Sequence, residues 1–159
     1  MPQSGTWRTP PRPWRNRGPA VTVRPDTILV IEADDDLRRL LSLALRLGGF
    51  ATREARDGLG AMAILDQEVR VGAIILDVVL PDIDGLSLRQ EIAARAGNLP
   101  VIVITESHED IPELHPSCVI RKPVMPDDIV VAVVKCLKDA RDPSQASPRS
   151  SRLQPPDRS

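Results

Sequence analysis

Short runs of β-branched, apolar residues alternate along the middle of this chain with longer segments in which apolar residues recur at helical spacing. The run at 27–31 (TILVI) is followed by leucines and alanines spaced over 37–47, and Gly48 and Gly49 then end the helical pattern. Continuous apolar runs are typical of strands buried on both faces of a parallel sheet. The alternation therefore predicts an α/β fold, a doubly wound parallel sheet with helices on both faces.

The same pattern continues to about residue 138. Asp35 or Asp36 is expected to cap the first helix, because a side-chain carboxylate there can accept from the free N–H groups of the first turn. The other expected strands are 50–54, 73–76, 101–105 and 118–121, and the other expected helices are 57–65, 84–95 and 126–138.

The two ends of the chain differ from this middle in composition. Residues 1–25 combine prolines with arginines and contain no acidic residue, and residues 141–159 hold almost no large apolar side chain. Such segments bury too little apolar surface to offset the entropy of ordering. We expect a disordered arm at 1–25, one folded domain at 26–140 and a disordered tail at 141–159.

Charge and cysteine content narrow the class of protein. The 21 Lys and Arg residues balance 22 Asp and Glu residues, so net charge gives no reason to expect nucleic acid or an anionic membrane as partner. Trp7 and Trp14 in the arginine-rich arm leave nucleic-acid binding as the less favoured reading of that arm. No apolar run reaches the roughly 18 to 20 residues that span a bilayer, and the two cysteines form no CxxC pair. These features predict a cytoplasmic protein.

Polar residues stand where the expected strands end. Glu32 and Asp34 follow the first strand, Asp77 the third, Thr105 the fourth and Lys122 the fifth. The carboxyl ends of parallel strands meet at one edge of the sheet and form its ligand crevice. A carboxylate there can attack phosphorus when a cation offsets charge repulsion, and Mg²⁺ prefers carboxylate oxygens. Glu32 and Asp77 supply such oxygens, Thr105 a hydrogen bond and Lys122 a positive charge for the phosphoryl oxygens.

Three of these residues also have a structural alternative. Asp34 could face solvent instead of a metal, Thr105 could cap the loop that follows its strand, and Lys122 could be a surface lysine. Asp77 has no such alternative, because a carboxylate that closes an apolar strand before a Leu-Pro-x-x-Asp-Gly turn has no obvious structural task.

Four segments together resemble the signature segments of response-regulator receiver domains, in the same order. They are ILVIEADDDLRRLL at 28–41, IILDVVLPDIDGL at 74–86, PVIVIT at 100–105 and VIRKP at 119–123. The resemblance covers roughly residues 27–139 and implies a flavodoxin-like (βα)5 fold with strand order 2-1-3-4-5. It also implies transfer of a phosphoryl group to Asp77 from a histidine kinase or phosphotransfer protein.

The resemblance assigns roles residue by residue. Glu32, Asp77 and the backbone carbonyl of Val79 would bind Mg²⁺, with Asp34 as a further ligand if it reaches the site. Thr105 would be the switch hydroxyl, and Lys122 would pair with the phosphate ahead of a proline, Pro123, whose peptide bond is commonly cis.

Two positions and one segment depart from the family pattern. Ala33 replaces the second of two adjacent acids, which predicts weakened Mg²⁺ binding, and Val119 replaces the aromatic residue whose rotation accompanies phosphorylation. The segment between Thr105 and Lys122 is short and contains Pro112 and Pro116, so we expect a shortened fourth helix there.

The sequence thus predicts a single-domain response regulator that signals through a protein partner, because the chain after residue 139 is too short and polar for an output domain. Its own catalysis would be limited to self-phosphorylation and autodephosphorylation. The alternative is a receiver-like interaction module that works without phosphorylation, for which the three departures argue. A nucleotide-binding α/β domain is set aside, since the first strand is followed by neither GxxxxGK[ST] nor GxGxxG.

Overall fold

A computed structural model of the chain describes residues 26–67, 70–97, 99–109 and 119–142. Strands and helices alternate along them, as the sequence predicts. The elements are β1 (Thr27–Ile31), α1 (Asp35–Leu47), β2 (Ala51–Ala55), α2 (Gly58–Leu65), β3 (Val71–Asp77), α3 (Gly85–Ala96), β4 (Val101–Thr105), β5 (Val119–Arg121) and α4 (Pro126–Arg141). The predicted disordered arm at 1–25, nearly all of the predicted tail and the shortened helix expected between Thr105 and Lys122 lie outside the described residues.

The strands of the described part form one parallel sheet in the order β2-β1-β3-β4-β5. This order confirms the predicted flavodoxin-like topology. β1 and β3 are neighbours at the centre of the sheet, with Ile31 of β1 opposite Leu76 of β3, and β4 pairs with the other edge of β3. The carboxyl ends of these three strands therefore lie side by side.

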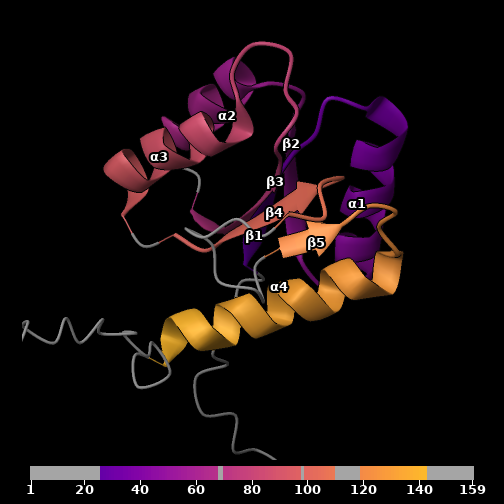
Figure 1. Cartoon of the computed structure of the whole chain (residues 1–159). Coiled ribbons are helices and arrows are strands. Elements are labelled where there is room, and N and C mark those ends of the chain that lie inside the picture. The colour runs from indigo at the N-terminus through magenta and orange to yellow at the C-terminus, as the bar shows by residue number, and fades with distance from the viewer. Residues whose placement is uncertain (1–25, 68–69, 98, 110–118, 143–159) are drawn as a thin grey trace, which may run out of the picture.

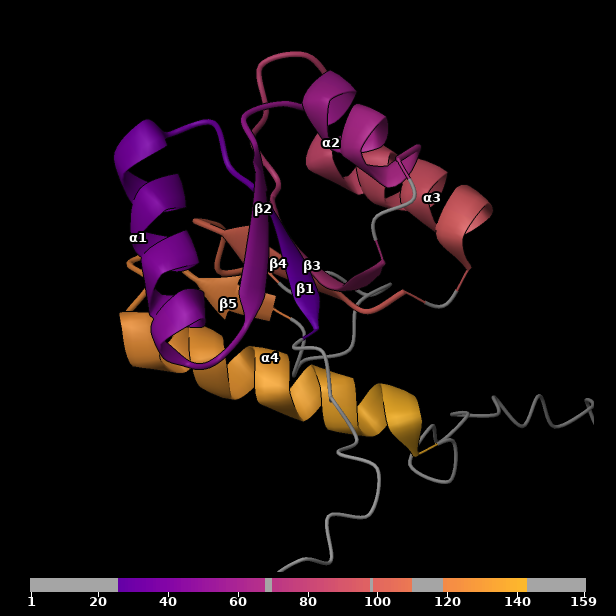
Figure 2. The ribbon, with the colours of Figure 1, turned by 180° about the vertical axis from the view of Figure 1, so that it is seen from behind.

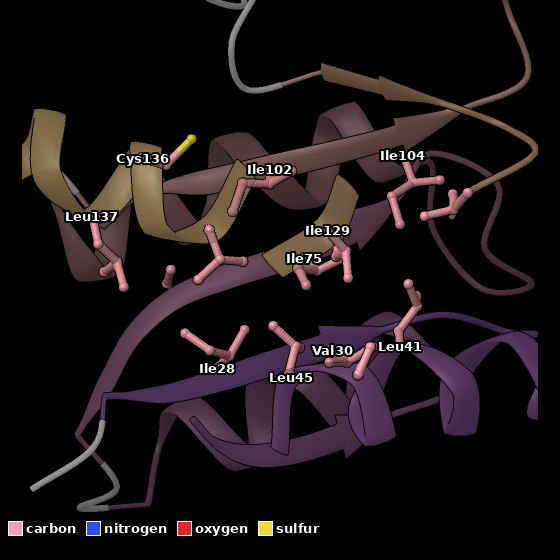
Figure 3. Close-up of a cluster of buried hydrophobic side chains, with 14 residues drawn as sticks. Ile28, Val30, Leu41, Leu45, Ile75, Ile102, Ile104, Ile129, Cys136 and Leu137 are labelled. Carbon is pink, nitrogen blue, oxygen red and sulfur yellow. The ribbon is translucent and has the colours of Figure 1, made fainter. Parts of the chain in front are cut away.

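Helices cover both faces of the sheet. Figures 1 and 2 show α1 and α4 together on one face and α2 and α3 together on the other. Side chains alternate along β1 and β3, so that Ile28 and Ile75 contact the α1/α4 layer and Leu29 and Ile74 contact the α2/α3 layer. Figure 3 shows the first of these two cores, with strand isoleucines directed at Leu45 and Leu137 of the helices. Burial of one such side chain stabilises the fold by roughly 1.5 to 3 kcal/mol.

The cap of α1 corrects one expectation. Asp34, not Asp35 or Asp36, is the N-cap: its backbone is extended and its side chain accepts from the backbone N–H of Leu37 at 2.7 Å. Asp35 and Asp36 instead lie in the first helical turn, where their charges favour the positive end of the helix dipole.

The other three helices begin at or next to the predicted positions. Asp57 caps α2 and Asp84 caps α3, and Pro126 stands at the start of α4. α4 runs to Arg141, beyond the expected end near residue 138, and the guanidinium of Arg141 pairs with Asp26 just before β1. This pair joins the last helical turn to the start of the sheet. Within the described ranges, no helix is long and apolar enough to cross a bilayer.

Candidate functional site

The polar residues predicted to converge lie at the carboxyl edge of the sheet. Asp77 is the last residue of β3 and Thr105 the last of β4, while Glu32 and Lys122 directly follow β1 and β5. The Nζ atom of Lys122 lies 2.6 Å from Asp77 Oδ2 and 3.6 Å from Glu32 Oε2. The main-chain N–H of Lys122 donates to the carbonyl of Thr105 at 2.9 Å. Four strands separated in sequence thus contribute to one site.

Asp77 is held through both carboxylate oxygens. Oδ1 accepts from the backbone N–H of Val79 at 2.8 Å, and Oδ2 accepts from Lys122. Asp77 is only 3% exposed, whereas Val79 is 70% exposed. A group that reacts with Asp77 therefore needs the Lys122 side chain, which contacts Oδ2, to shift.

Glu32 is the more strongly perturbed carboxylate. It is 2% exposed, and its Oε1 accepts from the backbone N–H of Asp34 at 3.0 Å. Burial, reinforced by the hydrogen bond and negative charge of Asp77, raises the pKa of Glu32 to about 7, against lowering contributions from the Asp34 N–H and Lys122. Glu32 therefore takes up a proton far more readily than an exposed glutamate.

Two opposed effects act on the pKa of Lys122. Burial alone would lower the pKa of its ammonium, but the hydrogen bond and charge of Asp77 and the charge of Glu32 outweigh it and raise the pKa. The ammonium is thus held in its charged form between two carboxylates. The Lys122–Pro123 peptide bond is cis, as the family resemblance predicts.

Thr105 and Asp34 already have local hydrogen bonds. The hydroxyl of Thr105 is buried and accepts from the backbone N–H of Ser107 at 3.0 Å, so it stabilises the loop after β4 while its own proton stays available to donate. Asp34 is exposed and uses Oδ1 for the cap of α1.

The oxygens of this site suit a hard divalent cation such as Mg²⁺. Glu32 Oε2 is buried and has no hydrogen-bond partner among the described residues, so it is an acceptor that a cation would satisfy. Asp77 supplies a second carboxylate. Ala33, however, contributes no side-chain oxygen, and the described residues contain no group of three or more His, Cys, Asp or Glu side chains placed to hold a metal.

Three further residues shape the site and were not assigned a role from sequence. Arg38, whose side chain is 13% exposed, donates through Nη1 to the carbonyl of Glu32 at 2.8 Å and so holds the β1–α1 loop. Gly85 packs so closely that a Cβ there would lie 2.6 Å from the carbonyl oxygen of Asp77. Asp82 joins the β3–α3 loop to α2 through two hydrogen bonds. The Asp-Gly pair at 84 and 85 was a visible signal, but the other two contacts need the fold to be known.

Comparison with protein families agrees with this arrangement. The model of the family described as "response regulator receiver domain" matches residues 28–134. The chain belongs to the response regulator receiver family. The match runs from the second residue of β1 to the first half of α4 and covers the other described strands in full, so it includes the whole candidate site.

Relatives and solved structures fit the same family. The receiver is 30% identical over 122 residues to the transcriptional regulatory protein CpxR homolog of Haemophilus influenzae, covering 74% of this chain and 52% of that protein. It is 38% identical over 85 residues to the transcriptional regulatory protein AfsQ1 of Streptomyces coelicolor, covering 54% of this chain and 37% of that protein. The receiver thus spans about half or less of these regulators.

Among solved structures, a putative response regulator from Chloroflexus aurantiacus is 28% identical with a TM-score of 0.62, covering 72% of this chain and 98% of that one. The chemotaxis response regulator CheY4 of Vibrio cholerae is 19% identical with a TM-score of 0.63, covering 70% and 98%, and this likeness concerns the fold alone.

Proposed function

We propose that this receiver accepts a phosphoryl group on Asp77 from a histidine kinase or phosphotransfer protein and signals through a protein partner. The observation that carries the proposal is the contact between Asp77 Oδ2 and Lys122 Nζ at 2.6 Å, beside the buried Oε2 of Glu32, which accepts no hydrogen bond from the described residues. A nucleophilic carboxylate, a cation for the phosphoryl oxygens and a free metal-ligand oxygen then lie within one site.

In the proposed step, an oxygen of Asp77 forms a bond to phosphorus while the phosphorus–nitrogen bond of the donor phosphohistidine breaks. The histidine leaves with the electron pair of that bond and is protonated from solvent. Lys122 moves from the carboxylate of Asp77 to a phosphoryl oxygen, and the hydroxyl of Thr105 donates to another. Val79 N–H keeps Asp77 oriented through Oδ1.

Mg²⁺, when bound, would supply positive charge that offsets repulsion between the carboxylates and the phosphoryl oxygens. Glu32, Asp77 and the carbonyl of Val79 would hold it, with Asp34 as a further candidate ligand. Because Ala33 brings no carboxylate, we infer weaker Mg²⁺ binding than two adjacent acids would give.

We propose one receiver domain at 26–140 that works in the cytoplasm, where its kinase would phosphorylate it. Its own catalysis is limited to self-phosphorylation from small donors and slow hydrolysis of the acyl phosphate. A protein partner reads the surface that changes on phosphorylation. The transcriptional roles named for the relatives belong to those longer proteins.

A second candidate is a receiver that binds its partner without being phosphorylated. The 3% exposure of Asp77 and the alanine at position 33 favour it. The two candidates differ in whether Asp77 reacts with a phosphoryl donor at all.

The test is incubation of the full chain with Mg²⁺ and phosphoramidate, a donor with the phosphorus–nitrogen bond of phosphohistidine, followed by intact-mass measurement. We expect one added phosphoryl group on the wild type and on Asp36→Asn, which changes an exposed first-turn carboxylate of α1. Asp77→Asn should take up none. An unmodified wild type, or an equally modified Asp77→Asn, would refute the proposal and favour the phosphorylation-independent module.

A further inference from the structure

The loop between β3 and α3, residues 78–84, sets the geometry around Asp77. Val79 in this loop donates its N–H to Asp77 Oδ1, and Val78 bonds to both β4 and α3: its N–H donates to Ile104 at 3.2 Å and its carbonyl accepts from Gly85 at 3.0 Å. These contacts fix the two ends of the loop. The segment between them has a separate attachment.

That attachment is the carboxylate of Asp82, which links the loop to α2. Asp82 accepts from the backbone N–H of Gly58 through Oδ1 and from that of Leu59 through Oδ2, both at 2.9 Å. Gly58 and Leu59 are the first residues of α2, 24 and 23 positions earlier in the chain. The N-cap residue of α2, Asp57, accepts from the next N–H, that of Gly60, at 2.7 Å. Two aspartates thus share the N-terminus of one helix, and only one of them belongs to the loop.

The approach of the loop to α2 depends on the absence of a side chain at position 58. A Cβ on Gly58 would lie 2.4 Å from Ile83 Cγ2 and 3.3 Å from Asp82 Oδ2. The N–H of Gly58, followed by that of Leu59, also holds the pKa of Asp82 below its usual range despite some opposing desolvation, so the carboxylate stays charged at neutral pH. The close packing at Gly58 and the negative charge of Asp82 therefore both favour the contact between the loop and α2.

We propose that Asp82 is a positioning residue of the phosphoacceptor site, which fixes the β3–α3 loop against α2 so that Val79 stays aligned with Asp77. This proposal rests on the proposed function of Asp77. Asp82 does not touch the reacting atoms, and it acts through the backbone of Val79.

The test compares Asp82→Ala with Asp57→Ala in the full chain. Both variants remove a carboxylate from the N-terminus of α2, so both are expected to lower the urea midpoint by a similar amount. Only Asp82→Ala releases the loop. It should raise the Mg²⁺ concentration for half-maximal phosphorylation by phosphoramidate about 10-fold, as loss of a supporting contact beside a metal ligand does. Asp57→Ala should keep the wild-type Mg²⁺ requirement.

A second readout does not depend on phosphorylation. Amide hydrogen exchange at Val79 should quicken in Asp82→Ala and stay at the wild-type rate in Asp57→Ala, since the Val79 N–H bonds to Asp77 only while the loop is held. Equal effects of the two variants on Val79 exchange would overturn the positioning role, whatever Asp77 does with a phosphoryl donor. If the wild type takes up no phosphoryl group while Val79 exchange responds to Asp82 alone, the proposed function fails and the loop attachment stands.

Discussion

Glu32 is a buried carboxylate, and its burial disfavours the negative charge that it would carry in water. It lies at the carboxyl edge of the sheet, next to the buried carboxylate of Asp77, and its Oε2 accepts no hydrogen bond from the described residues. Burying a carboxylate is costly, and the Lys122 ammonium, 3.6 Å from Glu32 Oε2, offsets only part of this cost, so Glu32 keeps its proton up to about pH 7 when no metal ion is bound. The same property that makes Glu32 a candidate metal ligand therefore makes it a pH-sensitive part of the fold.

This conflict predicts a pH dependence of stability. The pKa of Glu32 is about 7 in the fold against 4.5 for a free glutamate, so folding favours the protonated form. Its stabilising contribution is complete below pH 4.5 and is lost as the pH rises through about 7. Without Mg²⁺, the free energy of unfolding of the wild type should fall relative to that of Glu32→Gln by about 1 to 3 kcal/mol between about pH 5 and pH 8.

Urea denaturation of both proteins across this range checks the prediction. The difference between them isolates Glu32 from Asp35 and Asp82, whose lowered pKa values act in the opposite direction. A constant difference would contradict the pKa assigned to Glu32.

Ala33 predicts a gain of metal binding on substitution. Ala33→Asp would restore a second carboxylate next to Glu32, and Mg²⁺ affinity measured by calorimetry should tighten about 10-fold. Gln90→Asp adds the same charge at an exposed position of α3 and serves as the control. Equal affinity in Ala33→Asp and the wild type would mean that position 33 does not face the cation.

At the scale of elements, the turn from β3 into α3 tolerates no side chain at Gly85. A Cβ there would lie 2.5 Å from Val78 Cα and 2.6 Å from the carbonyl oxygen of Asp77, both backbone atoms that cannot move independently. Gly85→Ala should cost about 2 kcal/mol or more, whereas Gln90→Ala on the exposed face of α3 should change stability by less than about 0.5 kcal/mol. Thermal unfolding of the two variants checks this, and similar melting temperatures would show that the turn is looser than described.

The elements themselves were largely predictable because apolar periodicity and caps are local properties. Asp57, Asp84 and Pro126 mark helix starts that the sequence indicated. The cap of α1 was misassigned since three consecutive aspartates can each cap, and the backbone at Asp34 decides among them. The last residues of α4 include Arg141, whose pair with Asp26, a residue distant in sequence, could not be read from local periodicity.

At the scale of the whole molecule, the convergence of Glu32, Asp77 and Lys122 followed from one rule, that parallel strands end at a common edge. The strand order, by contrast, was expected only from the resemblance to receiver domains. The attachments of Arg38 and Asp82 could not be predicted in this way. Each is an ordinary charged residue in the sequence, and its role depends on which backbone groups the folded sheet brings within reach.

The central claim is that residues from the ends of four strands form one phosphoacceptor site, and amide NMR tests it most directly. The full chain would be titrated with beryllium fluoride, an analogue of the phosphoryl group, at saturating Mg²⁺. We expect the amide signals of Glu32, Val79, Thr105 and Lys122 to shift together with a single midpoint, and Asp77→Asn to abolish the shifts. Signals that move with separate midpoints, or that move equally in Asp77→Asn, would contradict it.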